Sequence, residues 1–259
     1  MKFSIITPSF NQGRFIGDCI ESVLAQTEVE VEHIIRDAGS TDETLEVLAK
    51  YPHLKWSSEP DRGMSDGINK GFRQANGDWL MWLNCDDYLL PSALAKIAEH
   101  ILKNQNADVV YADCVFVDES KNLIERKYGV PANAWTIYAS CHIPSTSAFY
   151  KKRIIDAGEL VNIDYKLCMD WEFYLRLLRK GYAFSYMPEA IAGFRWHDSN
   201  TSILIRQSSG GEAPRLRREH IRELGLPAWL CGKTCTVIYR YLMKAARMIQ
   251  RFKIHRKFL

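Results

Sequence analysis

The chain has 259 residues, a formal net charge of +3, 47% hydrophobic residues and 25% charged residues. This composition excludes an intrinsically disordered chain and is sufficient for one large domain, or one domain with an appendage. Seven scattered cysteines do not suggest a disulfide framework, and they indicate small buried side chains in a reducing compartment.

Short apolar strands alternate with amphipathic helices over the first part of the chain. Ser40 lies three residues before Glu43, which predicts a capping box for a helix through Leu48. Alternation of this kind indicates parallel βαβ units. The predicted strands in this part cover residues 2–7, 29–37 and 55–57. The other predicted helices cover residues 14–26 and 65–75.

Beyond these units the alternation loosens. The whole pattern predicts an α/β fold with a mixed, mainly parallel sheet flanked by helices and followed by a C-terminal helical extension. We place the boundary between a domain of residues 1–205 and an extension of residues 206–259. The later predicted elements are helices at 92–103 and 170–180, a strand at 108–113, a hairpin at 115–128, an irregular segment at 135–150 and a short strand before Phe194.

An apolar run over residues 79–83 is followed closely by two adjacent carboxylates, Asp86 and Asp87. The run predicts a strand that is buried on both faces of the sheet. Ligands of open α/β sheets bind beyond the carboxyl ends of the strands, where two acids can share one divalent cation that also holds phosphates. The alternative is that both carboxylates only cap the next helix.

Two common nucleotide-binding motifs are absent after the first strand. Residues 8–13 contain neither the G-x-G-x-x-G of a dinucleotide-binding fold nor a P-loop. The phosphates of a nucleotide ligand would therefore be held by a metal and by side chains.

Four ordered blocks resemble family 2 of the inverting glycosyltransferases, and in particular its bacterial polysaccharide-biosynthesis members. The blocks are IITPSFN (5–11), IRDAGSTD (35–42), EPDRG with the residues up to Gly71 (59–71), and ANGDW running into LNCDD (75–87). The resemblance covers about the first 200 residues. It implies a Rossmann-like GT-A fold and inverting transfer of a sugar from a nucleoside diphosphate sugar to a hydroxyl group.

The resemblance also assigns residues to the nucleotide sugar. Thr7 and Asp37 would lie beside the base and the ribose, while Asp66, Asn69 and Lys70 would line the pyrophosphate or sugar pocket. Alternatively, Asp37 is a turn residue at the end of its strand, and Lys70 is a solvated charge on a helix.

The expected cofactor is Mg²⁺ or Mn²⁺. The resemblance places Asp86 near the ribose and the metal, makes Asp87 a direct ligand, and brings His197 to the metal or pyrophosphate. A lone histidine is otherwise more often a packing residue. The chain departs from the family pattern at Ala38, where many members carry a second acid, and at Asn84, which replaces the first aspartate of the D-x-D block.

Inverting transfer needs a general base that deprotonates the acceptor hydroxyl. The resemblance assigns this role to Asp170, which matches better than Glu172. The alternative is that Asp170 only caps the helix that begins there.

The extension is strongly basic, with 13 Lys and Arg against 3 Asp and Glu from Arg206 to Leu259. Apolar residues recur at helical spacing from Val237, which predicts an amphipathic cationic helix. We expect peripheral membrane contact through residues 237–259, with packing on the domain or on a second copy in a homodimer as the alternative. No recognised nucleic-acid-binding pattern accompanies the charge.

The first residues do not match a signal peptide, so we expect none, and no apolar run reaches the ~18 residues of a membrane span. We therefore expect a cytoplasmic enzyme at the inner face of the membrane that glycosylates a lipid-linked or saccharide acceptor. The alternatives are a sugar nucleotidyltransferase, which typically has a Gly-rich basic loop after its first strand, and a non-catalytic nucleotide-sugar-binding protein.

Overall fold

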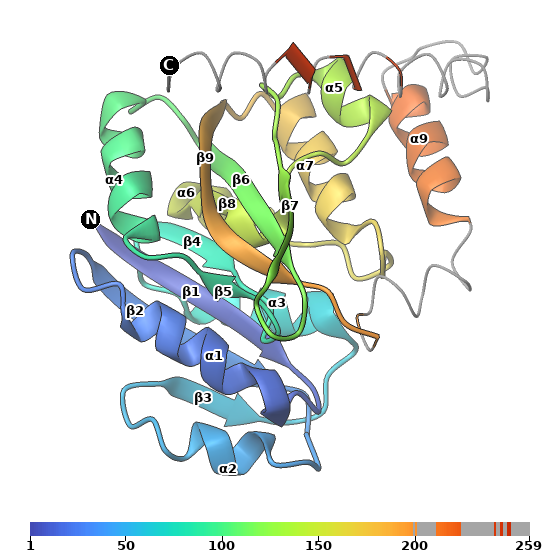
Figure 1. The fold of residues 1–259 in the computed structure, drawn as a ribbon. Helices are drawn as coiled ribbons and strands as arrows, with labels where there is room; N and C mark the ends of the chain where they lie inside the picture. Colours follow the sequence, from blue (N-terminus) through green and yellow to red (C-terminus); the bar gives the residue numbers. More distant parts are fainter. Residues whose placement is uncertain (199, 201–210, 224–240, 242–243, 246–247, 250–259) are drawn as a thin grey trace.

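The computed structural model describes residues 1–198, 200, 211–223, 241, 244–245 and 248–249. Within these residues, nine strands form one mixed sheet in the order β3-β2-β1-β4-β8-β6-β9-β5, and β7 pairs with β6 (Figure 1). The strands are β1 (Lys2–Ser9), β2 (Glu30–Asp37), β3 (Lys55–Ser58), β4 (Trp79–Trp82), β5 (Tyr88–Leu89), β6 (Val109–Val117), β7 (Leu123–Lys127), β8 (Ala148–Lys151) and β9 (Phe184–Arg195). The helices are α1 (Gly13–Leu24), α2 (Thr44–Leu48), α3 (Met64–Gln74), α4 (Ala93–Lys103), α5 (Ala134–Ala139), η1 (Ser145–Ser147), α6 (Lys152–Asp156), α7 (Met169–Arg179) and α9 (Glu212–Glu223).

Strand direction brings the functional segments to one edge of the sheet. β1 is parallel to β2 and β4, and β2 is parallel to β3, with Ile6 opposite both Ile34 and Trp82. β8 is antiparallel to β4 and β6, and β9 is parallel to β6. The carboxyl ends of β1, β2, β4 and β9 therefore lie at the same edge, which is where ligands bind in open α/β sheets.

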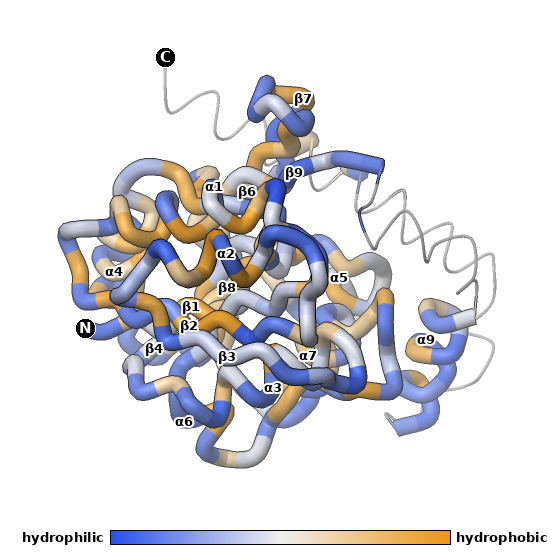
Figure 2. The backbone as a smooth tube through the Cα atoms, turned by 90° about the horizontal axis from the view of Figure 1, so that it is seen from below, coloured by the Kyte–Doolittle hydropathy of each residue, from blue (hydrophilic) through white to orange (hydrophobic). Residues whose placement is uncertain are grey.

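Helices cover both faces of the sheet because successive side chains of each buried strand point to opposite sides. Phe3 and Ile5 of β1 belong to the core under α1 and α4, whereas Ile6 belongs to the core under α3 and α7. Hydrophobic and hydrophilic residues alternate along the outer helices, which Figure 2 shows as orange and blue segments, and their buried positions recur at helical spacing. The fold is therefore a three-layer α/β/α arrangement.

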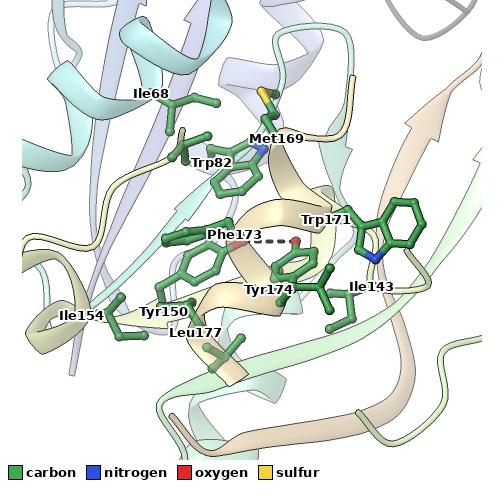
Figure 3. Packing of buried hydrophobic residues seen from close by; sticks show 14 of the residues in the cluster. Ile68, Trp82, Ile143, Tyr150, Ile154, Met169, Trp171, Phe173, Tyr174 and Leu177 are labelled. Carbon is green, nitrogen blue, oxygen red and sulfur yellow. Dashed lines mark hydrogen bonds between the residues drawn. The ribbon is translucent and has the colours of Figure 1, made fainter. Parts of the chain in front are cut away.

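Aromatic rings of α7 pack against aromatic rings of the sheet (Figure 3). The ring of Trp82 on β4 stacks on Tyr150 at 5.3 Å, and Phe173 of α7 lies 5.2 Å from Tyr150. The Tyr150 hydroxyl donates a hydrogen bond of 3.1 Å to the hydroxyl of Tyr174. Large buried rings contribute strongly to core stability, so this cluster sets the position of α7 relative to the end of β4.

The predicted α/β architecture and the buried strand before the carboxylates are confirmed, since all four residues of β4 are buried. The predicted capping box is wrong. The Ser40 hydroxyl donates to Asp37, and α2 begins after Glu43 without a side-chain cap. β1 also continues through Pro8 to Ser9. This is tolerated because β4 pairs with β1 only up to Ile6, so Pro8 has one neighbouring strand instead of two.

The second half of the chain differs more from the predictions. The segment predicted to be irregular contains α5, η1 and β8, and the strand before His197 is a 12-residue element instead of a short one. The strand at 108–113 and the first arm of the predicted hairpin form the single strand β6. These elements pair with partners that are distant in the sequence, so their local pattern is weak.

Part of the extension packs into the same core as the sheet. Leu216 and Ile221 of α9 are buried with Trp171 of α7. The boundary after residue 205 stays a prediction. Of the helix predicted from Val237 onward, only residues 241, 244–245 and 248–249 are described. No helix in the described ranges is long and apolar enough to cross a bilayer.

A pair of glycine substitutions tests the packing of α3 on the sheet. In Gly71→Ala the new Cβ would collide with the Ile6 side chain of β1, so we expect the free energy of unfolding to fall by ~1–3 kcal/mol. Gly17→Ala on α1 is the control, because its nearest neighbour would be 3.9 Å away on Val47, and alanine favours a helix. Chemical denaturation of both variants measures the difference, and equal stabilities would contradict the close packing.

Candidate active site

The loop after β4 presents one carboxylate to side chains that follow β9. Oδ2 of Asp86 accepts hydrogen bonds from Nε2 of His197 at 3.0 Å and from Nδ2 of Asn200 at 3.2 Å. A carboxylate only accepts hydrogen bonds, so the imidazole donates through Nε2. The structure thus brings together Asp86 and His197, which lie 111 positions apart in the sequence. It also adds Asn200, which the sequence reasoning missed.

The neighbouring carboxylate has a different environment. Asp87 is buried, and its Oδ1 accepts a hydrogen bond of 2.9 Å from the backbone N–H of Arg195. Its Oδ2 accepts one of 3.1 Å from Nδ2 of Asn84. Burial, and then the negative charge of Asp86, raise the pKa of Asp87 well above its ordinary value. This geometry joins the end of β4 to the end of β9, and the metal contact of Asp87 stays a prediction.

Arg195 also takes part in this connection of Asp86 and Asp87 to the end of β9, which we call the joint. The sequence reasoning missed this residue too. Its guanidinium is buried and donates to the backbone carbonyls of Asp86 and Glu119 at 3.0 and 3.1 Å. It also donates to the Asp18 carboxylate at 2.6 Å and lies 4.8 Å from the centre of the Phe15 ring. A buried arginine needs such partners. In the sequence, however, it looks like any other basic residue beside a strand end.

A cavity of about 250 Å³ lies next to this joint. Asn84, Asp86, Asn200 and Asp170 all line it. The Oδ1 atom of Asn84 is buried and has no hydrogen-bond partner. The remaining wall consists of Met64, Phe116, Lys127, Cys141, His142, Ile143, Pro144, Ser145, Lys166, Leu167, Met169 and Phe194.

Asp170 is the second residue of α7, and the helix is preceded by Cys168 as N-cap without a side-chain cap bond. The N-cap interpretation of Asp170 is therefore wrong. Its Oδ1 accepts from the backbone N–H of Trp171 at 2.7 Å, and its Oδ2 from the Cys141 thiol at 3.4 Å. Burial raises the pKa of Asp170 above its ordinary value. A raised pKa makes this carboxylate a stronger base once it is ionised.

Glu172, the weaker candidate, is bound elsewhere. Its carboxylate accepts hydrogen bonds from the Arg176 guanidinium at 2.7 and 3.1 Å, one helical turn away. It does not line the cavity. The geometry therefore favours Asp170 for chemistry and gives Glu172 a role within the helix.

The residues assigned to the nucleotide lie at the ends of β1 and β2. The Thr7 hydroxyl is fully buried and hydrogen-bonds Nε2 of His33 at 2.9 Å. The Asp37 carboxylate accepts from the backbone N–H groups of Gly39 and Ser40, and from the Ser58 hydroxyl at 2.6 Å. Asp37 thus makes the turn contacts of the alternative interpretation, and the nucleotide contacts of Thr7 and Asp37 stay predictions.

The three assigned residues of α3 do not line the cavity. Asp66 accepts hydrogen bonds from the backbone and the guanidinium of Arg62. Lys70 lies 3.3 Å from the Glu59 carboxylate and 3.7 Å from that of Asp66. Burial would raise the pKa of Asp66, but the hydrogen bonds from Arg62 and the charge of Lys70 lower it below its ordinary value.

Asn69 has a positioning role in this region. Its side-chain amide donates to the carbonyl of Val161 at 2.8 Å and accepts from the N–H of the same residue at 2.9 Å. It therefore holds the chain that leads toward α7. Its predicted contact with the sugar or pyrophosphate stays a prediction.

The described residues contain no group of three or more His, Cys, Asp and Glu side chains suited to a metal ion. A smaller donor set does fit a hard divalent cation. Asp86 offers carboxylate oxygen, Asn84 offers its unpartnered Oδ1, and His197 stands beside them. Mg²⁺ sites commonly use one or two protein oxygen ligands together with substrate phosphates and waters.

Comparison with known proteins identifies the family. The model of Glycosyl transferase family 2 matches residues 4–166. The chain belongs to glycosyl transferase family 2. This family 2 enzyme is 29% identical over 227 residues to the PGL/p-HBAD biosynthesis glycosyltransferase of Mycobacterium tuberculosis, covering 85% of this chain and 87% of that protein. It is 29% identical over 204 residues to the chondroitin synthase of Escherichia coli. That match covers 77% of this chain and 30% of the synthase.

Solved structures share the fold of this family 2 enzyme. S. aureus TarS in complex with UDP-GlcNAc has a TM-score of 0.65 and 20% sequence identity, covering 85% of this chain and 66% of that chain. The mannosyltransferase PcManGT from Pyrobaculum calidifontis, in complex with GDP-Man and Mn²⁺, has a TM-score of 0.60 and 16% sequence identity. The match covers 97% of this chain and 86% of PcManGT. The predicted GT-A fold and the family resemblance are thereby confirmed.

We expect the buried His33 to make the stability of the fold sensitive to acid. Burial, with a smaller contribution from His53, lowers the pKa of His33 to about 3. Below the unfolded value of ~6.5, the unfolded chain binds a proton that the folded protein excludes, so stability falls as pH drops toward the folded value. We expect His33→Gln to reduce this loss by up to ~1.4 kcal/mol per pH unit. Urea unfolding between pH 7 and 4 measures it.

His53→Gln is the matched control, because the His53 side chain is exposed. It should leave the pH dependence of unfolding close to that of the natural sequence. A His33→Gln variant with the same acid sensitivity as the natural sequence would show that His33 does not carry this linkage.

Proposed function

We propose that this family 2 glycosyltransferase moves a sugar from a nucleoside diphosphate sugar to a hydroxyl group and inverts the anomeric centre. One observation carries the proposal. Asn84, Asp86 and Asp170 all line the same cavity. Inverting displacement needs a proton acceptor on the incoming side and charge stabilisation on the leaving side.

Asp170 is the proposed general base. It lines the cavity, and its carboxylate is held by the Trp171 N–H and the Cys141 thiol. Burial raises its pKa, which increases its ability to take the proton of the acceptor hydroxyl as that oxygen attacks the anomeric carbon. The two hydrogen bonds restrict the rotation of the carboxylate and so keep it directed at one position.

The diphosphate leaving group would lie at the carboxyl end of β4. Asn84 and Asp86 would hold Mg²⁺ or Mn²⁺ through oxygen atoms, with His197, whose Nε2–H donates to the Asp86 carboxylate, beside the metal or the pyrophosphate. The bound cation would offset the charge that develops on the diphosphate. The Mn²⁺ in the PcManGT complex supports this assignment. Asp87 is also proposed as a direct metal ligand, and its buried carboxylate orients Asn84.

The base and ribose would lie over the ends of β1 and β2, near Thr7 and Asp37, with Asp66, Asn69 and Lys70 on the phosphate side. The parallel order of β3, β2, β1 and β4 supports this placement, because it puts all of these strand ends at the same edge as Asp86. The ligands in the TarS and PcManGT complexes make UDP-GlcNAc and GDP-mannose the first donors to test.

The acceptor is proposed to be a saccharide or lipid-linked hydroxyl compound of the cell surface. The names of the mycobacterial and chondroitin-synthesising relatives support this class. Aromatic side chains also frame the cavity. Phe116 and Phe194 line it with ring centres 5.1 Å apart, and the ring of the half-exposed Trp196 lies 6.0 Å from each. Peripheral membrane contact through residues 237–259, next to a lipid-linked acceptor, is part of the same proposal.

Replacing the general base should stop transfer without removing the donor site. We expect Asp170→Asn to lower the turnover number by roughly 10²–10⁴-fold, because an amide cannot take the acceptor proton. The affinity for UDP, measured by calorimetry, should be unchanged. The assay is the acceptor-dependent release of nucleoside diphosphate from UDP-GlcNAc and GDP-mannose, with cell-surface glycan and lipid extracts as acceptors.

Asp164→Asn is the matched control, because its exposed side chain precedes the same helix and does not line the cavity. It should retain full turnover. Transfer by Asp170→Asn at the natural rate would remove this residue from its role. Donor binding by the natural enzyme without turnover on any extract would favour a non-catalytic nucleotide-sugar-binding protein.

Binding of the divalent cation should depend on Asp86, which follows β4. We expect Asp86→Asn to weaken Mn²⁺ binding in the presence of UDP by at least tenfold, which follows from the loss of an anionic oxygen ligand. Electron paramagnetic resonance of free Mn²⁺ measures this directly, and Asp156→Asn, whose exposed side chain pairs with Lys152 and does not line the cavity, is the control. Unchanged Mn²⁺ affinity in Asp86→Asn would contradict the assignment.

A further inference from the structure

The first residue of α9 binds the backbone that leads into α7. The carboxylate of Glu212 accepts hydrogen bonds from three consecutive backbone N–H groups, those of Lys166, Leu167 and Cys168, at 3.0, 2.9 and 3.0 Å. Hydrogen bonds from N–H groups to a charged carboxylate are stronger than neutral ones. Burial alone would raise the pKa of Glu212, but these three donors lower it below its ordinary value.

Other contacts hold α9 against the same segment. Tyr165 donates its hydroxyl to the Glu219 carboxylate, and the guanidinium of Arg215 lies 4.8 Å from the Tyr165 ring centre. The guanidinium of Arg217 lies 4.7 Å from the ring centre of Trp171, the residue after Asp170. Figure 1 shows α9 on the same side of the molecule as α7. These contacts come from separate turns of α9, so the helix is seated along its length.

The segment that Glu212 binds is part of the cavity wall. Lys166, Leu167 and Met169 line the cavity together with Asp170. Cys168 lies two residues before Asp170 and is the N-cap of α7. The backbone that Glu212 holds therefore leads directly into the start of the helix and to Asp170. A displacement of about 1 Å in a reacting group can lower a rate by ~10²-fold.

We propose that Glu212 is a positioning residue, which acts from the basic extension through the N–H groups of residues 166–168 and fixes Asp170 in the cavity. The helix α9 is then a part of the catalytic unit, although it lies beyond the region that matches the family model. This inference rests on the proposed role of Asp170. The donor site near Asp86 is independent of it.

Hydrogen exchange tests the structural half of the proposal in the full-length protein without any substrate. In Glu212→Gln only one side-chain oxygen remains to accept from three N–H groups, so we expect the amides of residues 166–168 to exchange roughly tenfold faster. Glu223→Gln is the control, because Glu223 ends the same helix and pairs with Arg179 of α7 without touching this segment. Equal protection of residues 166–168 in both variants would overturn the proposal.

Steady-state kinetics test the functional half. We expect Glu212→Gln to lower the turnover number roughly tenfold to hundredfold while the donor KM stays unchanged, and Glu212→Ala to lower it further. Glu223→Gln should keep the natural turnover number. A rise in donor KM, or the same loss in Glu223→Gln, would indicate a general effect of helix docking and would overturn the positioning role.

The two possible failures are distinguishable. If the natural enzyme transfers no sugar from any donor to any extract, the proposed function fails, while the exchange experiment still reports on the contact of Glu212 with residues 166–168. If the natural enzyme is active and Glu212→Gln is equally active, the proposed function stands and this inference is overturned. Thermal unfolding of each variant confirms that the compared proteins are folded.

Discussion

The buried joint between the ends of β4 and β9 is the constraint on which the rest of the site depends. Asp87 accepts the backbone N–H of Arg195, and the Arg195 guanidinium returns to the carbonyl of Asp86. These bonds hold two segments together that are far apart in the sequence, and they bring His197 and Asn200 to the Asp86 carboxylate. The joint is stable because each buried charge has a partner.

The part of the cavity wall that α7 contributes has a different origin. Aromatic packing of Trp82, Tyr150 and Phe173 places α7 against the sheet, close to the strand that leads to Asp86. The same burial that makes this packing favourable raises the pKa of Asp170. Stability and reactivity therefore have a common physical cause here, since removing water from the helix start strengthens both hydrophobic contact and the basicity of the carboxylate.

Local sequence patterns were sufficient for the first half of the fold. Alternating strands and helices predicted β1 to β4 nearly in place, because each parallel strand is buried and reads as an apolar run. They failed where pairing is distant: β8 is short and lies between β4 and β6, and β9 reads as a weak strand although it is long. The capping box failed because Ser40 found a better acceptor in Asp37, at the end of the preceding strand.

By itself the sequence determined the fold class, the family and the candidates Asp86, His197 and Asp170, because these depend on residue order and on the spacing of recognisable blocks. Only the tertiary structure decided which side chains share a cavity. It separated Asp86, which faces the cavity, from Asp87, which faces β9, and it revealed Arg195, Asn200 and Glu212. The direction of a side chain and the burial of its charge follow from packing between distant segments, and no local pattern encodes them.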